Sequence, residues 1–247
     1  MDLKRRIREA IPQKYVYTLL HLKKSLPFVG DASFKSYSGN GEDIILKEYL
    51  FKGKKNGFFV DVGAFHPKII SNTFLLSKAG WRGINIEPNP QAYKLFQKYR
   101  PKDINLKLGV AEVASEKTYY NFSYSGANTF DVTVGEQKSE KDWNTVISKE
   151  KLHCEPLKTI LEMHVPANTE IDLLDIDVEG LDLEVLKSND WNRFRPKVVL
   201  VEDKEFRQNP GQSDVYLFML EQGYRFYSYL DITLVMVEQS FKRNSSI

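Results

Sequence analysis

Cysteine is almost absent from this sequence, since Cys154 is the only one in 247 residues. A single thiol cannot form a disulfide within the chain, and sparse cysteine fits a protein of a reducing compartment. We expect Cys154 to be a small hydrophobic packing residue. A fold held together by internal disulfides is therefore excluded.

Long apolar runs are also missing from the sequence. No stretch approaches the roughly 20 consecutive apolar residues of a membrane-spanning helix, and no hydrophobic segment is followed by a small-residue cleavage site. We therefore expect a cytoplasmic protein.

Charge of one sign is not in excess over the whole chain. The 35 basic and 33 acidic residues give a formal net charge of +2, and hydrophobic residues make up 42%. The composition therefore predicts no nucleic-acid partner and is ordinary for a globular protein. A chain of 247 residues suits one α/β domain with modest additions.

The first 35 residues differ from the rest of the chain. Up to Lys24, lysine and arginine outnumber the acids Asp2 and Glu9, and an apolar stripe at residues 15–22 lies between basic clusters. We favour a helix that packs on its own domain with a solvated basic face. The alternative is an amphipathic helix that contacts an anionic membrane or a partner enzyme. We predict a helical extension at 1–35 and a main domain at 36–247.

The segment at residues 56–67 predicts one edge of a ligand site. Residues 58–62 form an apolar run typical of a central parallel strand. Gly63 and Ala64 follow, where the absence of large side chains lets a ligand approach the backbone. Asp61, Gly63 and Ala64 are therefore candidate cofactor-binding residues, although a plain strand end explains the same pattern.

A polar turn precedes this segment and leads into a helix. Either Asn40 or Gly41 caps the helix, and Glu42 and Asp43 lie favourably near its positive N-terminus. The turn either serves only as a cap or folds over the ligand, and in the second case Glu42 contacts the cofactor. The residues expected on the buried side are Ile44, Ile45, Tyr49 and Leu50.

Strands and helices then alternate along the chain. Predicted strands at 58–62, 84–87 and 104–110 are separated by predicted helices at 71–78 and 88–99. This βαβαβ order is half of a doubly wound fold.

Glu87 ends the second predicted strand, 24 residues after Gly63. A carboxylate at this point can accept hydrogen bonds from both hydroxyls of a ribose, which predicts an adenosine-containing ligand. The GxGxxG pattern of dinucleotide sites is missing, and Pro67 cannot donate a backbone N–H to a pyrophosphate. S-adenosylmethionine carries adenine and ribose without phosphate and meets this description.

An acidic cluster marks the fourth predicted strand, at residues 171–180. Asp175 and Asp177 project to the same face near the carboxyl end of the strand, and Glu179 follows. Buried carboxylates need partners, here a cation, backbone amides, or the amine or sulfonium of the ligand. Asp177 is thus a candidate for the cofactor or the reaction, and Asp177 with Glu179 for binding Mg²⁺. The alternative is that Asp177 only caps the helix that begins near Leu181.

The middle of the chain, residues 112–158, is the least regular. A strand is expected at 117–124, and its aromatic residues either pack across strands or form the wall of a substrate pocket. The stretch 134–142 is charged, and we expect it to be exposed.

The last third of the chain predicts the remaining strands of the sheet. A fifth strand at 196–203 and a helix at 215–222 precede two adjacent strands at 224–230 and 232–237. A hairpin of this kind is the usual end of a class I methyltransferase. The prediction is an α/β protein with a mostly parallel, seven-stranded sheet and a C-terminal antiparallel hairpin.

The residues from about 36 to 237 resemble the FkbM family of S-adenosylmethionine-dependent methyltransferases. The resemblance rests on the Tyr-Ser-x-x-Gly-Glu-Asp pattern at 37–43, residues 59–64 with His66 and Pro67, and the motifs at 71–73, 80–87, 89–90 and 176–180. It implies a Rossmann-like methyltransferase fold and O-methylation of hydroxyls, often on sugars or polyketides. The chain departs from the family pattern at Gly39 and Asp175, and residues 1–35 lie outside the resemblance.

Methyl transfer from a sulfonium is an in-line displacement, and an alcohol must lose its proton during the attack. His66 lies beyond the glycine turn and titrates in a suitable range, but a histidine before proline is equally compatible with shaping the turn. Asp177 and Glu179 are the rival bases, or ligands of a divalent cation such as Mg²⁺ that activates the hydroxyl.

We therefore expect a methyltransferase that acts on a hydroxyl of a sugar, glycan or glycolipid-type precursor. Glu87 holds the ribose, Asp61, Gly63 and Ala64 border the methionine end, and Asp177 and Glu179 face the reaction. Two alternatives remain open. One is an NAD(P)-dependent reductase of Rossmann type, and the other is a non-catalytic module that scaffolds glycan-biosynthesis enzymes through its basic N-terminus.

Overall fold

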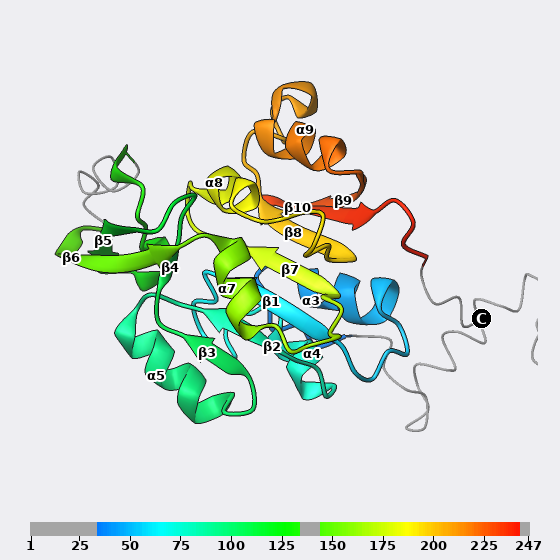
Figure 1. Cartoon of the computed structure of the whole chain (residues 1–247), viewed down its shortest axis with the longest axis horizontal. Helices are drawn as coiled ribbons and strands as arrows, with labels where there is room; N and C mark the ends of the chain where they lie inside the picture. The colour runs from blue at the N-terminus through cyan, green and yellow to red at the C-terminus, as the bar shows by residue number, and fades with distance from the viewer. Residues whose placement is uncertain (1–33, 134–143, 243–247) are drawn as a thin grey trace, which may run out of the picture. The chain divides into compact units, whose positions relative to one another are not determined.

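The computed structural model describes residues 34–133 and 144–242 (Figure 1). The predicted extension at 1–35, apart from its last two residues, and the charged stretch at 134–142 lie outside the described residues and stay predictions. Within the described part of the chain, no helix combines the length and apolar character needed to cross a bilayer.

Seven strands form the main sheet, in the order β3-β2-β1-β7-β8-β10-β9. Strand β10 runs antiparallel to both of its neighbours, and the other pairs are parallel. The predicted Rossmann-like, mostly parallel, seven-stranded sheet with a C-terminal antiparallel hairpin is confirmed. The strands are β1 (Phe58–Val62), β2 (Arg82–Ile86), β3 (Ile104–Leu106), β7 (Leu173–Ile176), β8 (Val198–Glu202), β9 (Tyr224–Leu230) and β10 (Thr233–Glu238).

The central strands are buried on both faces because helices cover both sides of the sheet. Every residue of β1 is buried, and Phe59 and Val60 belong to different hydrophobic clusters because successive side chains alternate between faces. The Val60 face packs against helices α7 (Leu157–His164), α8 (Asp182–Lys187) and α9 (Asp214–Glu221). The Phe59 face packs against the π-helix η1 (Ile45–Leu50) and helix α4 (Phe74–Lys78).

Two helix starts bear on the sequence predictions. Helix α5 (Pro90–Tyr99) begins as expected, because the Asn89 side chain accepts hydrogen bonds from the N–H groups of Gln91 and Ala92 and proline takes the first position. Helix α3 (Glu42–Ile44) is preceded by Gly41 without a side-chain cap, and the chain then continues directly into η1.

The expectation that Tyr49 is buried is wrong, since 52% of its surface is exposed. The prediction assumed the spacing of an α-helix, whereas the segment winds with the i→i+5 hydrogen bonds of a π-helix, which turn side chains to different directions. Leu50 is buried as predicted, and Leu46, which we did not assign to the buried side, is buried as well.

The predicted third strand, 104–110, is in fact two strands in different sheets. Strand β3 stays in the main sheet, while β4 (Gly109–Val110) pairs in parallel with β6 (Val146–Glu155). The chain can leave the main sheet and pair with β6 here because position 109 has no side chain. A Cβ at that position would lie 2.5 Å from Sγ of the buried Cys154. The second sheet, β4-β6-β5, is completed by β5 (Ser115–Phe122) and stands beside one end of the main sheet (Figure 1).

Candidate active site

A pocket opens beyond the carboxyl ends of β1, β2 and β7. The chain runs outward from β1 to β3 on one side of the sheet and from β7 to β8 on the other, so the order reverses between β1 and β7. Ligands of doubly wound folds bind at such a switch point. The second sheet and the 3-10 helix η2 (Ser125–Ala127) supply a further wall.

Gly63 follows β1 directly, with a backbone angle φ of 80°, a conformation that favours glycine. A Cβ added to Gly63 would lie 1.8 Å from the carbonyl oxygen of Asp177. Gly63 and Ala64 do line the pocket, as expected. Position 63 nevertheless requires glycine mainly because the backbone after β7 leaves no room for a Cβ, rather than because a ligand approaches there.

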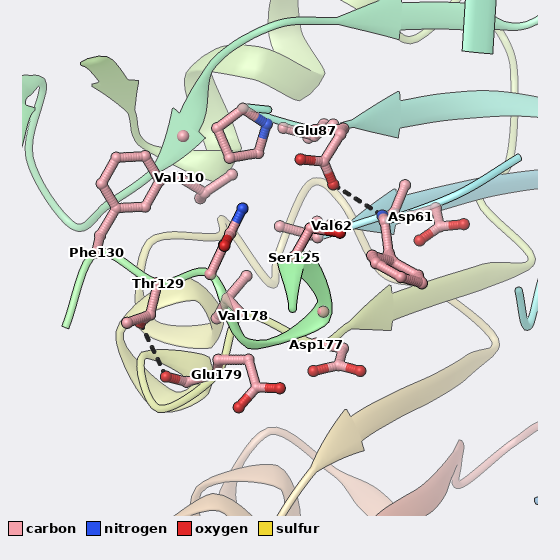
Figure 2. Close-up of a pocket in the computed structure, with 18 of the residues that line it drawn as sticks. Asp61, Val62, Glu87, Val110, Ser125, Thr129, Phe130, Asp177, Val178 and Glu179 are labelled. Carbon is pink, nitrogen blue, oxygen red and sulfur yellow. Dashed lines mark hydrogen bonds between the residues drawn. The ribbon is translucent and has the colours of Figure 1, made fainter. Parts of the chain in front are cut away.

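Glu87 lies at the end of β2 and is only 6% exposed. Its Oε2 accepts a hydrogen bond from the Phe65 N–H at 2.8 Å, drawn as the dashed line at Glu87 in Figure 2. Its Oε1 accepts one from the Asn89 N–H at 2.7 Å. Burial raises the pKa of Glu87 to about 7, against the effect of these two bonds. Each carboxylate oxygen keeps a second acceptor direction, so the group can still accept two hydroxyls.

Asp61 is the polar residue of β1, and a buried chain of hydrogen bonds holds it. The Thr73 hydroxyl donates to Asp61 at 2.5 Å and accepts from Arg100 Nη1 at 2.9 Å. Arg100 Nε donates in turn to Asp103 at 2.7 Å. Burial raises the pKa of Asp61, and the Thr73 bond and the Arg100 charge oppose that shift. We assigned no role to Thr73 or Arg100 from the sequence, because their contact with Asp61 depends on the packing of separate helices.

Asp175 lies directly beside Asp61, because the two residues are paired in the register of β7 and β1. Both are almost fully buried, at 5% and 4% exposure. Asn72 Nδ2 donates to Asp175 Oδ1 at 3.2 Å. Burial, together with the neighbouring Asp61 carboxylate, raises the pKa of Asp175 well above its usual range.

Asp177 follows β7 and is open to solvent on the side of the pocket. Protein atoms surround the group on its other sides, and this enclosure, followed by the carboxylates of Glu202 and Asp182, raises the pKa of Asp177. Solvent that reaches the group weakens these effects relative to Asp175.

Asp177 does not cap helix α8. The side chain of Asp182 accepts the N–H groups of Val178 and Gly180, at 3.3 and 3.2 Å. These bonds hold the turn before the helix. The position before α8 is Leu181, and no side chain accepts a hydrogen bond as its N-cap, so the capping interpretation of Asp177 is wrong.

Glu179 lines the pocket with its backbone in the left-handed region, at a φ of 54°. Its carbonyl oxygen accepts a hydrogen bond from the Thr129 hydroxyl at 3.0 Å, which links the segment after β7 to the wall beyond η2 (Figure 2). Phe65 and Ile70 also line the pocket with φ values of 54° and 51°. Such conformations cost of order 1–3 kcal/mol each and cluster at functional sites.

His66 and Glu42 are not among the residues that line the pocket. His66 Nδ1 accepts the N–H groups of Lys68 and Ile69, each at 3.1 Å, which is the turn-shaping arrangement. Burial and the Lys68 charge lower the pKa of His66. Glu42 is buried, and its Oε2 accepts the Asn40 N–H at 2.8 Å.

A metal centre finds no support in the part of the chain that the structure describes. No group of three or more histidine, cysteine, aspartate or glutamate side chains there is arranged to hold an ion. Mg²⁺ binding by Asp177 and Glu179 therefore stays a prediction.

The second sheet contributes an aromatic wall. The rings of Tyr119 and Phe130 lie 4.7 Å apart and, with Val110, border the pocket. The two interpretations of the aromatic run near 117–124 hold for different residues: Tyr119 and Tyr124 line the pocket, while Tyr120 and Phe122 pack in a small core. No local pattern pointed to Phe130, because its neighbour Thr129 is held by a backbone bridge to Tyr120 of β5.

Comparison with known proteins gives one family. A model described as the methyltransferase FkbM domain matches residues 61–226. A search of curated proteins found no match. Among solved structures, the chain is similar to methyltransferase FkbM from Methylobacillus flagellatus KT, with 12% identity and a TM-score of 0.49 over 81% of this chain. The match covers 48% of that protein, so this chain spans about half of its length.

Proposed function

Because the chain belongs to the FkbM family of methyltransferases, we propose that it transfers a methyl group from S-adenosylmethionine to a hydroxyl oxygen. The proposed acceptor is a sugar, a glycan or a related biosynthetic precursor. The observation that carries the proposal is the buried Glu87 carboxylate, held by two backbone N–H groups at the end of β2 and facing the pocket.

The chemistry of the pocket wall fits this cofactor. Glu87 accepts the ribose hydroxyls, and Val110 with the ring of Phe130 offers apolar surface for the adenine beside it. The five carboxylates on the wall suit the positive charges of the sulfonium and the ammonium. They belong to Asp61, Glu87, Asp175, Asp177 and Glu179.

The same wall argues against the nicotinamide alternative. None of the described residues that line the pocket is a lysine, an arginine or a histidine. A pyrophosphate would therefore face carboxylates without a cationic side chain, at a turn that lacks the glycines of a dinucleotide site.

When bound, S-adenosylmethionine supplies a methyl group on positively charged sulfur. The work left to the protein is to hold the acceptor hydroxyl in line and to take its proton. We assign the role of general base, which takes the proton of the acceptor hydroxyl, to Asp177. This residue is open to the pocket, and its pKa is raised by its enclosure and by neighbouring acids. Glu179, two residues on, is placed to orient the same hydroxyl.

A sugar acceptor suits the outer part of the pocket. Phe65 and Tyr124, whose ring centroids are 6.4 Å apart, offer apolar faces to the C–H surface of a sugar ring. Ser125 and Asn128 add hydroxyl and amide groups that can bind its hydroxyls. Aromatic walls with a few polar groups are typical of small-molecule sites.

Transfer of labelled methyl tests the proposal. The protein is incubated with labelled S-adenosylmethionine and an extract of its producing cells, which is then separated into lipids, glycans and proteins. We expect label in the glycan or glycolipid fraction, and a parallel reaction with a chelator reports on Mg²⁺. Cofactor binding without label in any fraction would favour the non-catalytic scaffold instead.

A further inference from the structure

An exposed isoleucine in a strained backbone conformation borders the pocket. Ile70 lines the pocket with 52% of its surface exposed, and its φ is 51°. The left-handed region is an outlier for a β-branched residue, because the substituents on Cβ crowd the backbone there. Since half of the side chain stays in solvent, its burial recovers only part of the cost of the strain. Strain and exposure together therefore point to a role other than packing within the chain.

Hydrogen bonds on both sides of Ile70 hold this conformation. Before it, Nδ1 of His66 accepts two backbone N–H groups of the same turn. After it, the Ser71 N–H donates to the carbonyl oxygen of Tyr37 at 2.9 Å. The Tyr37 N–H donates in turn to the buried carboxylate of Asp43 at 2.7 Å. The turn is therefore anchored at both ends, and it presents the side chain at a fixed place on the pocket wall.

Two aromatic residues add to the apolar surface of the pocket. Phe65 and Tyr124 line the same pocket as Ile70, and Tyr124 is 49% exposed. A ligand that covers exposed apolar groups removes them from water and gains affinity. A ligand that offers only hydroxyl groups to these side chains would lose hydration without replacing it. This part of the pocket therefore favours a ligand with an apolar group.

We propose that Ile70 is a specificity residue for the methyl acceptor and contacts an apolar substituent that the acceptor carries beside its sugar, such as an acyl or alkyl chain. The proposal rests on the proposed function, because it narrows the acceptor of that same site. Contact with the acceptor takes the exposed apolar surface of Ile70 out of water, and this gain offsets the strain of its backbone.

Three variants separate this role from a structural one. I70N introduces a polar side chain of similar size that adopts the left-handed region more readily. I70V keeps an apolar, β-branched side chain. I147N is the matched control, because Ile147 on β6 is 68% exposed, has no positive φ and does not line the pocket.

The probe is the glycolipid fraction of an extract of the producing cells, supplied with labelled S-adenosylmethionine. Initial rates at increasing amounts of the fraction give an apparent KM for each protein, and the water-soluble glycan fraction is assayed in parallel. We expect label mainly in glycolipids. I70N should raise the apparent KM about fivefold or more, because about half of an isoleucine side chain no longer gives apolar contact. I70V should stay within about twofold of the wild type, and I147N should match it.

Two further measurements exclude a general structural effect. Calorimetry should give I70N the affinity of the wild type for S-adenosylhomocysteine. In urea, I70N should unfold at the same concentration as the wild type or at a higher one, because the strain is relieved. If I70N does not fold, I70A takes its place, with the same expected rise in the apparent KM.

Label confined to water-soluble glycans or proteins, or an unchanged apparent KM for I70N, overturns the acceptor contact while the proposed methyl transfer stands. Equal changes in I70N and I147N overturn it as well. A wild type that labels no fraction contradicts the proposed function, and the acceptor contact falls with it. The two failures are therefore distinguishable.

Discussion

Glu87 is buried, whereas the ribose-binding role that we propose for it requires an ionised carboxylate. Its pKa of about 7 means that the carboxyl group is partly protonated near neutral pH. A ribose donates its hydroxyls most strongly to the ionised form, so binding favours loss of the proton. The folded state holds this proton more tightly than the unfolded state. The contribution of Glu87 to stability is therefore full at acidic pH and is lost as the pH rises through about 7.

Cofactor affinity should therefore rise with pH. We predict that the affinity for 5′-methylthioadenosine, which lacks the ammonium, increases about tenfold between about pH 6 and about pH 8. E87Q should bind weakly and without this dependence, since its side chain does not titrate. Calorimetry across the range measures both, and a flat profile for the wild type would show that Glu87 does not accept the ribose hydroxyls.

The general base is the second prediction at the residue scale. D177N should lower kcat by about a hundredfold or more, the range for general-base catalysis, with little change in cofactor affinity. H66N keeps a side-chain oxygen that can accept the N–H groups of Lys68 and Ile69, and should retain most of the activity. Steady-state kinetics of the two variants separate the candidates. The assignment fails if H66N loses kcat and D177N does not.

At the scale of the elements, the approach between Gly63 and the segment after β7 fixes the site geometry. G63A would bring a methyl group within 1.8 Å of the Asp177 carbonyl at a φ of 80°. We predict a loss of about 3 kcal/mol or more in the free energy of unfolding.

A matched control is Gly211, in the short 3-10 helix η3 (Pro210–Gln212). A Cβ there meets only the Asn209 side chain, at 3.7 Å. G211A should therefore be close to neutral in urea unfolding. Similar losses for G63A and G211A would contradict the packing account.

The sequence predicted correctly those helices and strands whose limits are set by residues next to each other in the chain. Strand β1 appears at its predicted bounds because an apolar run followed by glycine leaves few alternatives, and α5 begins where Asn89 and Pro90 indicate. The split of 104–110 into β3 and β4 was not predictable in this way. It depends on pairing with β6, far along the chain, and on the packing of Gly109 against Cys154.

The residues of the candidate site likewise fall into those that the sequence could place and those that it could not. Residues at strand ends, such as Glu87 and Asp177, could be placed on the pocket because parallel strands end at one edge of the sheet. Ser71 and Phe130 could not, since each reaches the wall through a loop whose course depends on tertiary contacts. His66 looked well placed in the sequence, yet its Nδ1 is used within its own turn.

At the scale of the whole molecule, the main sheet and the second sheet each form part of the pocket wall. The order of the main sheet places the ends of β1, β2 and β7 around one pocket, and aromatic residues of the second sheet and of the segments next to it line one side of that pocket. The main sheet thus supplies the carboxylates, and the second sheet supplies apolar surface. That division suits the S-adenosylmethionine that we propose as the cofactor.

The most direct test of the account is equilibrium binding of S-adenosylhomocysteine and NADH to the wild type and to E87A, measured by calorimetry. The account predicts that the wild type binds S-adenosylhomocysteine and not NADH, and that E87A weakens this binding by about a hundredfold or more, since two hydrogen bonds to a charged group are lost. Tight binding of NADH without binding of S-adenosylhomocysteine, or unchanged affinity in E87A, would contradict it.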